Sequence, residues 1–184
     1  MTDNELGALI RSQLLLGLTA AGVTGVRVLA NYQPTSQGED PGNAIYFFKV
    51  SDPRVGWQIR RNAVVGDEAR KVEEQNIEST YQFMARVKQD PEDLSVPTAS
   101  DLLNTASMIM SSAAFTRALS AQGVGRQVIG EMRNPYFLNK HEQFEASPSF
   151  DFTVSHRRSI MTAVSVIDTI NQETHPIGGR PDGD

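Results

Sequence analysis

The stretch that decides the fold runs from Phe150 to Ile167 and reads FDFTVSHRRSIMTAVSVI. Its residues alternate between apolar and polar, as expected for an extended strand whose side chains point to opposite faces in turn. A typical strand has about five or six residues, so a stretch of about 18 predicts a strand or bent hairpin that projects beyond its own core. A projecting strand leaves backbone groups without partners, which favours assembly over catalysis. One face carries Phe150, Phe152, Val154, Ile160, Val164 and Val166, and the other carries Asp151, Thr153, Ser155, Arg157 and Ser159.

The composition is that of a folded chain with enough apolar material for one core. Of its 184 residues, 39% are hydrophobic and 21% are charged. The 17 basic and 22 acidic residues give a formal charge of −5, so no overall positive field attracts nucleic acid or acidic membranes. The absence of cysteine excludes disulfides, thiolate catalysis and cysteine-ligated zinc. The amino terminus lacks the basic region of a signal peptide and no apolar run reaches about 18 residues, so we expect cytosolic synthesis.

The remaining chain divides into helices and strands by its periodicity. Thr2 and Glu5 have the spacing of a capping box and open a helix over residues 3–21. A second helix begins with Thr98 or Ser100 as its cap and ends at Gly123. Strands are predicted over residues 26–32, 44–50, 57–64, 73–88 and 126–132, with a hairpin between the second and third of them and a flexible loop over 34–42.

These elements predict an α+β fold in which a mostly antiparallel sheet is packed by two main helices, with a long projecting β-strand or hairpin. We expect residues 1–170 to form a single domain. Residues 171–184 contain two prolines, three glycines and almost no apolar side chain, so they are expected to form a flexible C-terminal tail.

Candidate chemical motifs in the chain are weak. His141, Glu142 and Glu145 offer one imidazole and two carboxylates, but the second histidine of a HExxH zinc motif is absent, so a solvated polar turn is the preferred interpretation. Gly123 to Gly125 follow a helix, whereas a phosphate loop follows a strand, and a helix end explains them. No nucleophile elbow occurs. We therefore expect neither enzymatic activity nor a metal or cofactor.

The strongest basic clusters are Arg60 with Arg61, and His156 with Arg157 and Arg158. Adjacent side chains on a strand point to opposite faces, so neither cluster forms one continuous patch. We interpret them as partners of carboxylates at a subunit interface. The candidate interface residues are Arg60, Arg61, Phe152, Val154, His156, Arg157, Arg158 and Ile160.

The order of elements, together with scattered local likenesses, resembles the tail terminator or neck terminator proteins of tailed bacteriophages over residues 3–168. The likeness is carried by the early leucine-rich helix, by Glu74-Gln75 at the entry of the amphipathic strand and by Gly123-Val124-Gly125. Two further stretches carry it, Thr98-Ala99-Ser100-Asp101-Leu102-Leu103 and Phe144-Glu145-x-x-Pro148-Ser149-Phe150-Asp151-Phe152. The residues after Ile167 lie outside this pattern.

The resemblance implies a virion structural protein of the tail or neck, made in the host cytoplasm. Such a protein assembles as a hexameric ring at the head-proximal end of the tail. The ring stops tail-tube polymerisation and docks the head connector, while DNA passes through its bore without sequence-specific binding. The implied partners are further copies of this chain, the tail-tube protein and a head-tail connector or portal-proximal protein, with no membrane. The family has no catalytic residues to carry over.

Three alternatives remain open from the sequence. Another neck adaptor or a baseplate component has the same elements available. A small nucleic-acid-binding module using Arg60, Arg61, Arg157 and Arg158 is a rival from a different class. A hydrolase whose site is assembled from distant residues is the least favoured, because no recognisable nucleophile or metal motif supports it.

Overall fold

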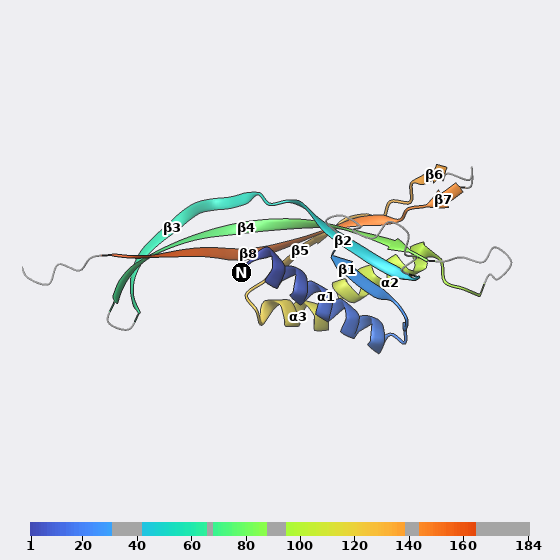
Figure 1. The fold of residues 1–184 in the computed structure, drawn as a ribbon, viewed down its shortest axis with the longest axis horizontal. Helices are drawn as coiled ribbons and strands as arrows, with labels where there is room; N and C mark the ends of the chain where they lie inside the picture. The colour runs from blue at the N-terminus through green and yellow to red at the C-terminus, as the bar shows by residue number, and fades with distance from the viewer. Residues whose placement is uncertain (31–41, 66–67, 88–94, 139–143, 165–184) are drawn as a thin grey trace, which may run out of the picture.

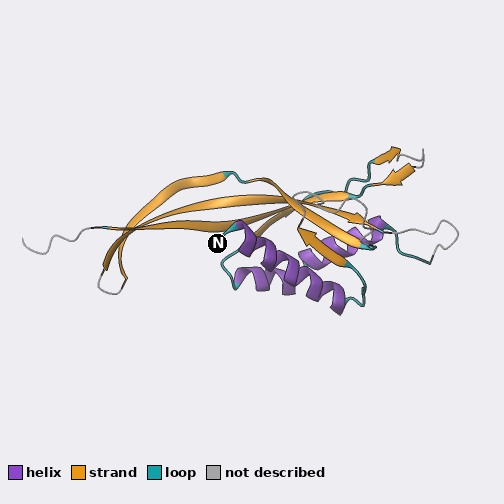
Figure 2. Ribbon diagram, viewed as in Figure 1, coloured by secondary structure: helices purple, strands orange, loops and turns teal. Residues whose placement is uncertain are grey.

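A computed structural model describes residues 1–30, 42–65, 68–87, 95–138 and 144–164, and the structural statements below concern these ranges. The fold is α+β, as predicted, with three helices on one face of a six-stranded sheet (Figures 1 and 2). The sheet has the order β1-β2-β4-β8-β5, and β3 pairs with β4 beside this path. Its pairings are antiparallel except for β1 with β2, and β6 and β7 form a separate two-stranded sheet.

The bounds of the elements follow the chain order. The helices are α1 (Asp3–Ala20), α2 (Ala99–Ser111) and α3 (Ala113–Ser120). The strands are β1 (Arg27–Ala30), β2 (Ala44–Ser51), β3 (Arg54–Val65), β4 (Glu68–Arg86), β5 (Gly125–Ile129), β6 (Tyr136–Leu138), β7 (Phe144–Ala146) and β8 (Ser149–Ala163).

Two unusually long strands divide the molecule into two regions. β4 has 19 residues and β8 has 15, and they pair without interruption over their shared length. We call the helix-covered region the body and the remainder the arm. The arm consists of β3, residues 68–77 of β4 and residues 156–163 of β8, and it extends away from the helices in Figure 1. The predicted projecting element is therefore one continuous strand, β8, held in a three-stranded sheet.

The core lies between the helices and one face of the sheet in the body. α1 buries Leu6, Ile10, Leu14 and Leu18 at helical spacing, and its capping box is formed as predicted. Facing it, Phe83 is fully buried and stacks on two rings from neighbouring strands. Its ring centroid lies 5.2 Å from that of Phe47 and 5.3 Å from that of Phe150. This aromatic row crosses three strands and joins them through side chains as well as backbone hydrogen bonds.

Four sequence-based expectations differ from the structure. The strands 44–50 and 57–64 do not form a hairpin, because β2 and β3 both pair with β4, one after the other along its length. Residues 44–50 are apolar on both faces, which predicts a central strand covered on both sides, but the three helices lie on one face only (Figure 2). Tyr46 and Phe48 of β2 therefore stay half-buried. The second main helix is divided at Ser112, whose backbone is extended and whose hydroxyl caps α3 by accepting from the Phe115 N–H at 3.2 Å. β6 and β7 were not anticipated. The predicted C-terminal tail lies outside the described residues, as do residues 34–41 of the predicted loop.

Candidate subunit interface

The arm carries most of the large apolar side chains that the described part of the chain leaves exposed. Seven of the eleven such residues lie on it or directly after it. Trp57 is the extreme case, with 95% of its surface exposed at a bulge of β3 that follows Gly56, whose φ is +72°. Exposed apolar surface on this scale indicates a surface that another protein covers. The seven residues are Val55, Trp57, Ile59, Val64, Ile160, Met161 and Val164.

The structure divides the predicted interface residues on β8 between core and surface. Phe152 and Val154 are fully buried, and His156 is 4% exposed, so these three belong to the protomer's own interior. Ile160 lies on the same face of the same strand, but it is 65% exposed because the helices end before reaching it. On the helix-bearing face, β8 is therefore exposed only beyond His156.

The predicted arginines pair with carboxylates of their own chain. Arg60 lies 3.2 Å from Glu73 on the face that carries the helices. On the opposite, bare face, Glu74 lies between Arg61 at 3.1 Å and Arg157 at 3.4 Å. These pairs cross from β3 and β8 to the central strand β4, and they neutralise charge that would otherwise attract phosphate. The arginines do not gather on one face, which fits the sequence-based expectation and weakens the nucleic-acid alternative.

A polar cluster marks the junction of arm and body. Lys49 lies 2.5 Å from Asp3 and 2.9 Å from Asp52, and Arg158 also pairs with Asp3. Burial by itself lowers the pKa of Lys49, but hydrogen bonds to the two carboxylates outweigh it and leave that pKa above the ordinary value. Burial likewise raises the pKa of Asp52, yet hydrogen bonds from Ser79 and Lys49 leave it lowered overall. The cluster ties the start of α1 to β2 and β8.

His156 occupies the buried end of this cluster. The Ser79 hydroxyl donates to the Asp52 carboxylate, so the Nε2 hydrogen of His156 donates to Ser79 across 2.9 Å. This arrangement makes Nδ1 an acceptor, and it has no hydrogen-bond partner among the described residues. Burial favours the neutral ring and lowers the pKa of His156, although the negative charge of Asp52 acts in the opposite direction.

The cluster does not have the geometry of a nucleophilic triad. In such a triad the imidazole lies between the carboxylate and the hydroxyl. Here Ser79 lies between Asp52 and His156, and Ser79 is fully buried. No group of three or more metal-ligating side chains occurs within the described ranges, while His141 and Glu142 of the weak metal motif lie outside them. No helix in the described part is long and apolar enough to cross a bilayer.

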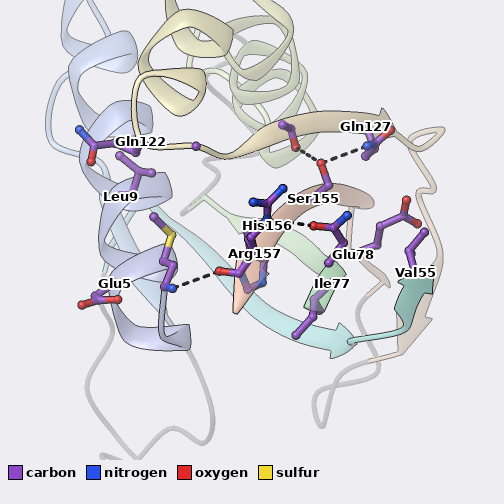
Figure 3. A pocket seen from close by; sticks show the side chains of 14 residues that line it. Glu5, Leu9, Val55, Ile77, Glu78, Gln122, Gln127, Ser155, His156 and Arg157 are labelled. Carbon is purple, nitrogen blue, oxygen red and sulfur yellow. Dashed lines mark hydrogen bonds between the residues drawn. The ribbon is translucent and has the colours of Figure 1, made fainter. Parts of the chain in front are cut away.

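A groove of about 980 Å³ borders the junction, and Figure 3 shows its lining. α1 supplies Glu5 and Leu9, the turn between α3 and β5 supplies Gln122, and β8 supplies His156 and Arg157. The groove thus lies where β5 begins and the edge of β8 becomes free.

Sequence reasoning missed Trp57, Glu74 and the Asp52, Ser79 and His156 chain of hydrogen bonds. Trp57 had a usable signal, because it is the one tryptophan of the sequence and follows a turn glycine. The hydrogen-bond chain had none, since its members come from the turn after β2, from β4 and from β8.

Comparison with known proteins gives a family match. The family model described as E217 gateway protein gp29 matches residues 5–166. Among solved structures, the chain is similar to the sheath/tube terminator, in its extended state, of an extracellular contractile injection system, PVC. That match has 13% identity and a TM-score of 0.48, and it covers 97% of this chain and 66% of the other. No curated protein matches.

Proposed function

The chain belongs to the family of the E217 gateway protein gp29, and on this premise we propose that it forms a ring at the head-proximal end of a phage tail. The family match confirms the expected relationship to phage tail terminator and neck proteins. In the proposed role the ring ends tail-tube assembly and joins the tail to the head connector. The other copies of this chain, the tail-tube protein and a connector or portal-proximal protein are its partners.

The observation that carries this proposal is the uncovered arm. Its three strands present apolar side chains while the protomer's own helices cover only the body. Among the described residues, no strand pairs with the outer edge of β3, and none pairs with the outer edge of β8 beyond Ser155. Free edges and exposed apolar surface on one element indicate a surface completed by another protein.

Ring closure explains how such a surface avoids uncontrolled growth. The two free edges belong to different strands, so a contact between them is heterologous and joins copies head to tail. Repetition of a heterologous contact produces an open fibre unless rotation closes it. A closed ring, which we propose to be a hexamer, leaves no free edge.

The electrostatics of the arm suit a bore through which DNA moves. Arg60, Arg61 and Arg157 are each paired with a glutamate of β4. Because each phosphate contact adds affinity and a salt-dependent hold on DNA, neutralised arginines permit passage without tight binding. We propose that DNA passes through the lumen without sequence-specific binding.

The test measures ring formation and tube capping together. Light scattering on the purified chain should give the mass of a closed oligomer, and electron-microscopy averages along the symmetry axis should show a ring with an open centre. Added to growing tail tubes, the protein should stop their elongation and appear at one end only. A monomer at every concentration that leaves tube length unchanged contradicts the proposal.

A neck adaptor is the second candidate, because the same free edges serve any ring. It differs in its neighbour: an adaptor binds the portal and leaves tube length unaltered. Binding to purified portal without capping of tubes therefore replaces the terminator role with the adaptor role.

A further inference from the structure

The outer edge of β8 changes from paired to unpaired at Ser155. β5 accompanies β8 as far as the pair of Gly125 with Ser155, and among the described residues no strand follows it further. Beyond that point, the N-terminal amine of Met1 donates to the Arg157 carbonyl oxygen on this edge at 3.3 Å. A row of backbone groups on this edge is thus available to a partner.

The direction of these groups follows from the hydrogen bonds at each end of the strand. The Val164 N–H donates to the Ala69 carbonyl oxygen of β4 at 3.0 Å, so even-numbered residues direct their backbone groups towards β4. Backbone groups of successive residues point to opposite sides of a strand. The residues whose N–H and C=O groups face outward are Arg157, Ser159, Met161 and Ala163.

The groove borders this free edge and provides room for side chains of an added strand. Leu9 gives it an apolar wall, and the Gln122 and Gln127 side chains each bring an amide oxygen that can accept a hydrogen bond (Figure 3). An occupant that is apolar and carries a donor fits both features. The indole of Trp57 is large, apolar and a donor only, and it is 95% exposed in the protomer.

The number of strands in the arm determines how two copies can join. β3 and β8 are both antiparallel to β4, so they run in the same direction. A sheet that continues edge to edge around a ring has its strands along the ring axis. Rotation about that axis preserves the strand direction from copy to copy. The β8 edge of one copy therefore meets the β3 edge of the next in parallel.

From the free edge, the groove and the strand count, we propose that β3 of a neighbouring copy pairs in parallel with β8 beyond Ser155, with the neighbour's Trp57 in the groove. The inference rests on the proposed ring and specifies its subunit contact. In one copy, Arg60 and Ile160 both lie opposite Glu73, so equivalent positions on the two outer strands are level with each other. Parallel pairing then brings the beginning of β3 beside His156 of β8 at the groove, and the ends of both strands together at the tip of the arm.

The exposed side chains of the two edges match on both faces of the arm. On the helix-bearing face, Val64 is 77% exposed, and Val164, which is level with it across Ala69, is 44% exposed. On the bare face, Ile59 is 46% exposed and Met161 is 54% exposed. Sheet extension between copies keeps each face continuous, so Val64 becomes a direct cross-strand neighbour of Val164 and Ile59 a diagonal neighbour of Met161, and both pairs lose water.

Cysteine cross-linking tests the direction of pairing, because the sequence has no native cysteine to interfere. Two variants place cysteines at matching ends, Val55→Cys with Arg157→Cys and Val64→Cys with Val164→Cys. Two control variants combine the same four substitutions across opposite ends, Val55→Cys with Val164→Cys and Val64→Cys with Arg157→Cys. Val55 and Val64 lie about 30 Å apart along β3, and an oxidised disulfide needs Cα atoms within about 7 Å, so disulfide formation distinguishes the two ends. Within one copy, the two cysteines of a matching end flank β4 about 10 Å apart, which is too far for a disulfide. Links between copies appear as a covalent ladder up to the full ring, whereas a link within one copy gives no ladder.

Parallel pairing predicts ladders from both matching-end variants, with single-cysteine variants as controls that give none. Ladders from both opposite-end variants, or no ladder from any variant whose rings form normally, overturn this inference and leave the proposed ring intact. Failure of the unmodified chain to form rings or cap tubes overturns the inference together with the proposed function.

Fluorescence tests the position of Trp57, since it is the one indole in the chain. Its emission should move to shorter wavelength as rings form and should stay unchanged in dilute monomer. Trp57→Ala should weaken association by about tenfold or more, as expected for a buried aromatic anchor, while Leu16→Ala on the exposed face of α1 should not. Rings that form with unshifted emission overturn the placement of Trp57 in the groove.

Discussion

The body and the arm are built from the same two strands but differ in what covers them. Phe152 and Ile160 lie on one face of β8, yet Phe152 is fully buried and Ile160 is 65% exposed. The body has three helices on that face, whereas the arm has none. The difference teaches that strand alternation specifies which side chains share a face, while the length of the helix layer decides which of them are buried within the protomer. The side chains beyond the helices stay exposed in the protomer.

Removal of Phe83 should have the largest effect on the body. Its ring stacks on Phe47 and Phe150 and meets Phe152 edge-on at 6.1 Å. Phe83→Ala should lower the free energy of unfolding by about 3–5 kcal/mol, because it leaves a cavity at the centre of the aromatic row. Urea unfolding monitored by circular dichroism measures this.

The matched control for Phe83 lies on the arm. Met161→Ala removes a side chain of similar apolar character that is 54% exposed, so monomer stability should change by no more than about 0.5 kcal/mol. Equal losses from the two substitutions would show that arm and body contribute alike to folding, and the comparison between them would fail.

A glycine at the helix contact should give the next largest effect. A Cβ on Gly17 would lie 2.2 Å from Cγ2 of Ile109, where α1 meets α2. Gly17→Ala should cost about 1–3 kcal/mol, since the overpacked helices must shift. Thermal unfolding at fixed concentration provides the measurement.

Gly7 offers the corresponding control on the same helix. A Cβ there would meet Cε2 of Phe47 at 3.8 Å, which is an ordinary contact. Gly7→Ala should therefore leave stability unchanged or raise it by up to about 1 kcal/mol through helix propensity. Destabilisation by both alanines would mean that the helix layer tolerates no added methyl group, and the specific contact with Ile109 would not be its explanation.

The features that sequence patterns predicted are those encoded locally. The Thr2 and Glu5 capping box and the alternation of Phe150, Phe152 and Val154 require only neighbouring residues, and both were confirmed. Pairing partners are not local. Nine residues of β3 pair with β4, whereas the predicted hairpin with β2 does not form, although two residues separate β3 from each of these strands. The length of the connection therefore does not reveal the partner.

The candidate interface residues include both buried and exposed side chains for a related reason. Phe152, Val154 and Ile160 share one periodic face, and the sequence cannot show that α1 begins beside His156 and leaves Ile160 bare. The division at Ser112 was also hidden, because a serine within an alanine-rich helix looks like a surface residue until its hydroxyl is seen to cap α3.

Acidification should weaken the junction between body and arm. Burial lowers the pKa of His156, although Asp52 attracts the charged form and Arg158 and Lys49 oppose it. The unfolded chain therefore binds this proton at a higher pH than the folded chain. The free energy of unfolding should fall as pH decreases below about 6.5, towards the lower folded pKa.

The contribution of His156 can be isolated by comparison with His156→Gln. Unfolding curves between about pH 8 and pH 5 should show a slope in the native chain that is reduced in the variant. An identical slope in both would assign the pH dependence to other groups and would remove His156 from the account of the junction.

The smallest effect on folding should come from the tip of the arm, where the effect on assembly should be clear. Ile160 and Val64 are exposed in the protomer, so replacing both with serine should change the free energy of unfolding of the monomer by no more than about 0.5 kcal/mol. In a ring these side chains are covered, and their loss should shift light-scattering mass towards the monomer. The control variant replaces Leu16 on α1 and Met108 on α2 with serine. Both side chains are exposed in the protomer, and the proposed contact between arms leaves them exposed in the ring. If the arm variant still forms rings at the native concentration while the helix variant does not, subunits meet through the helices and the arm has another purpose.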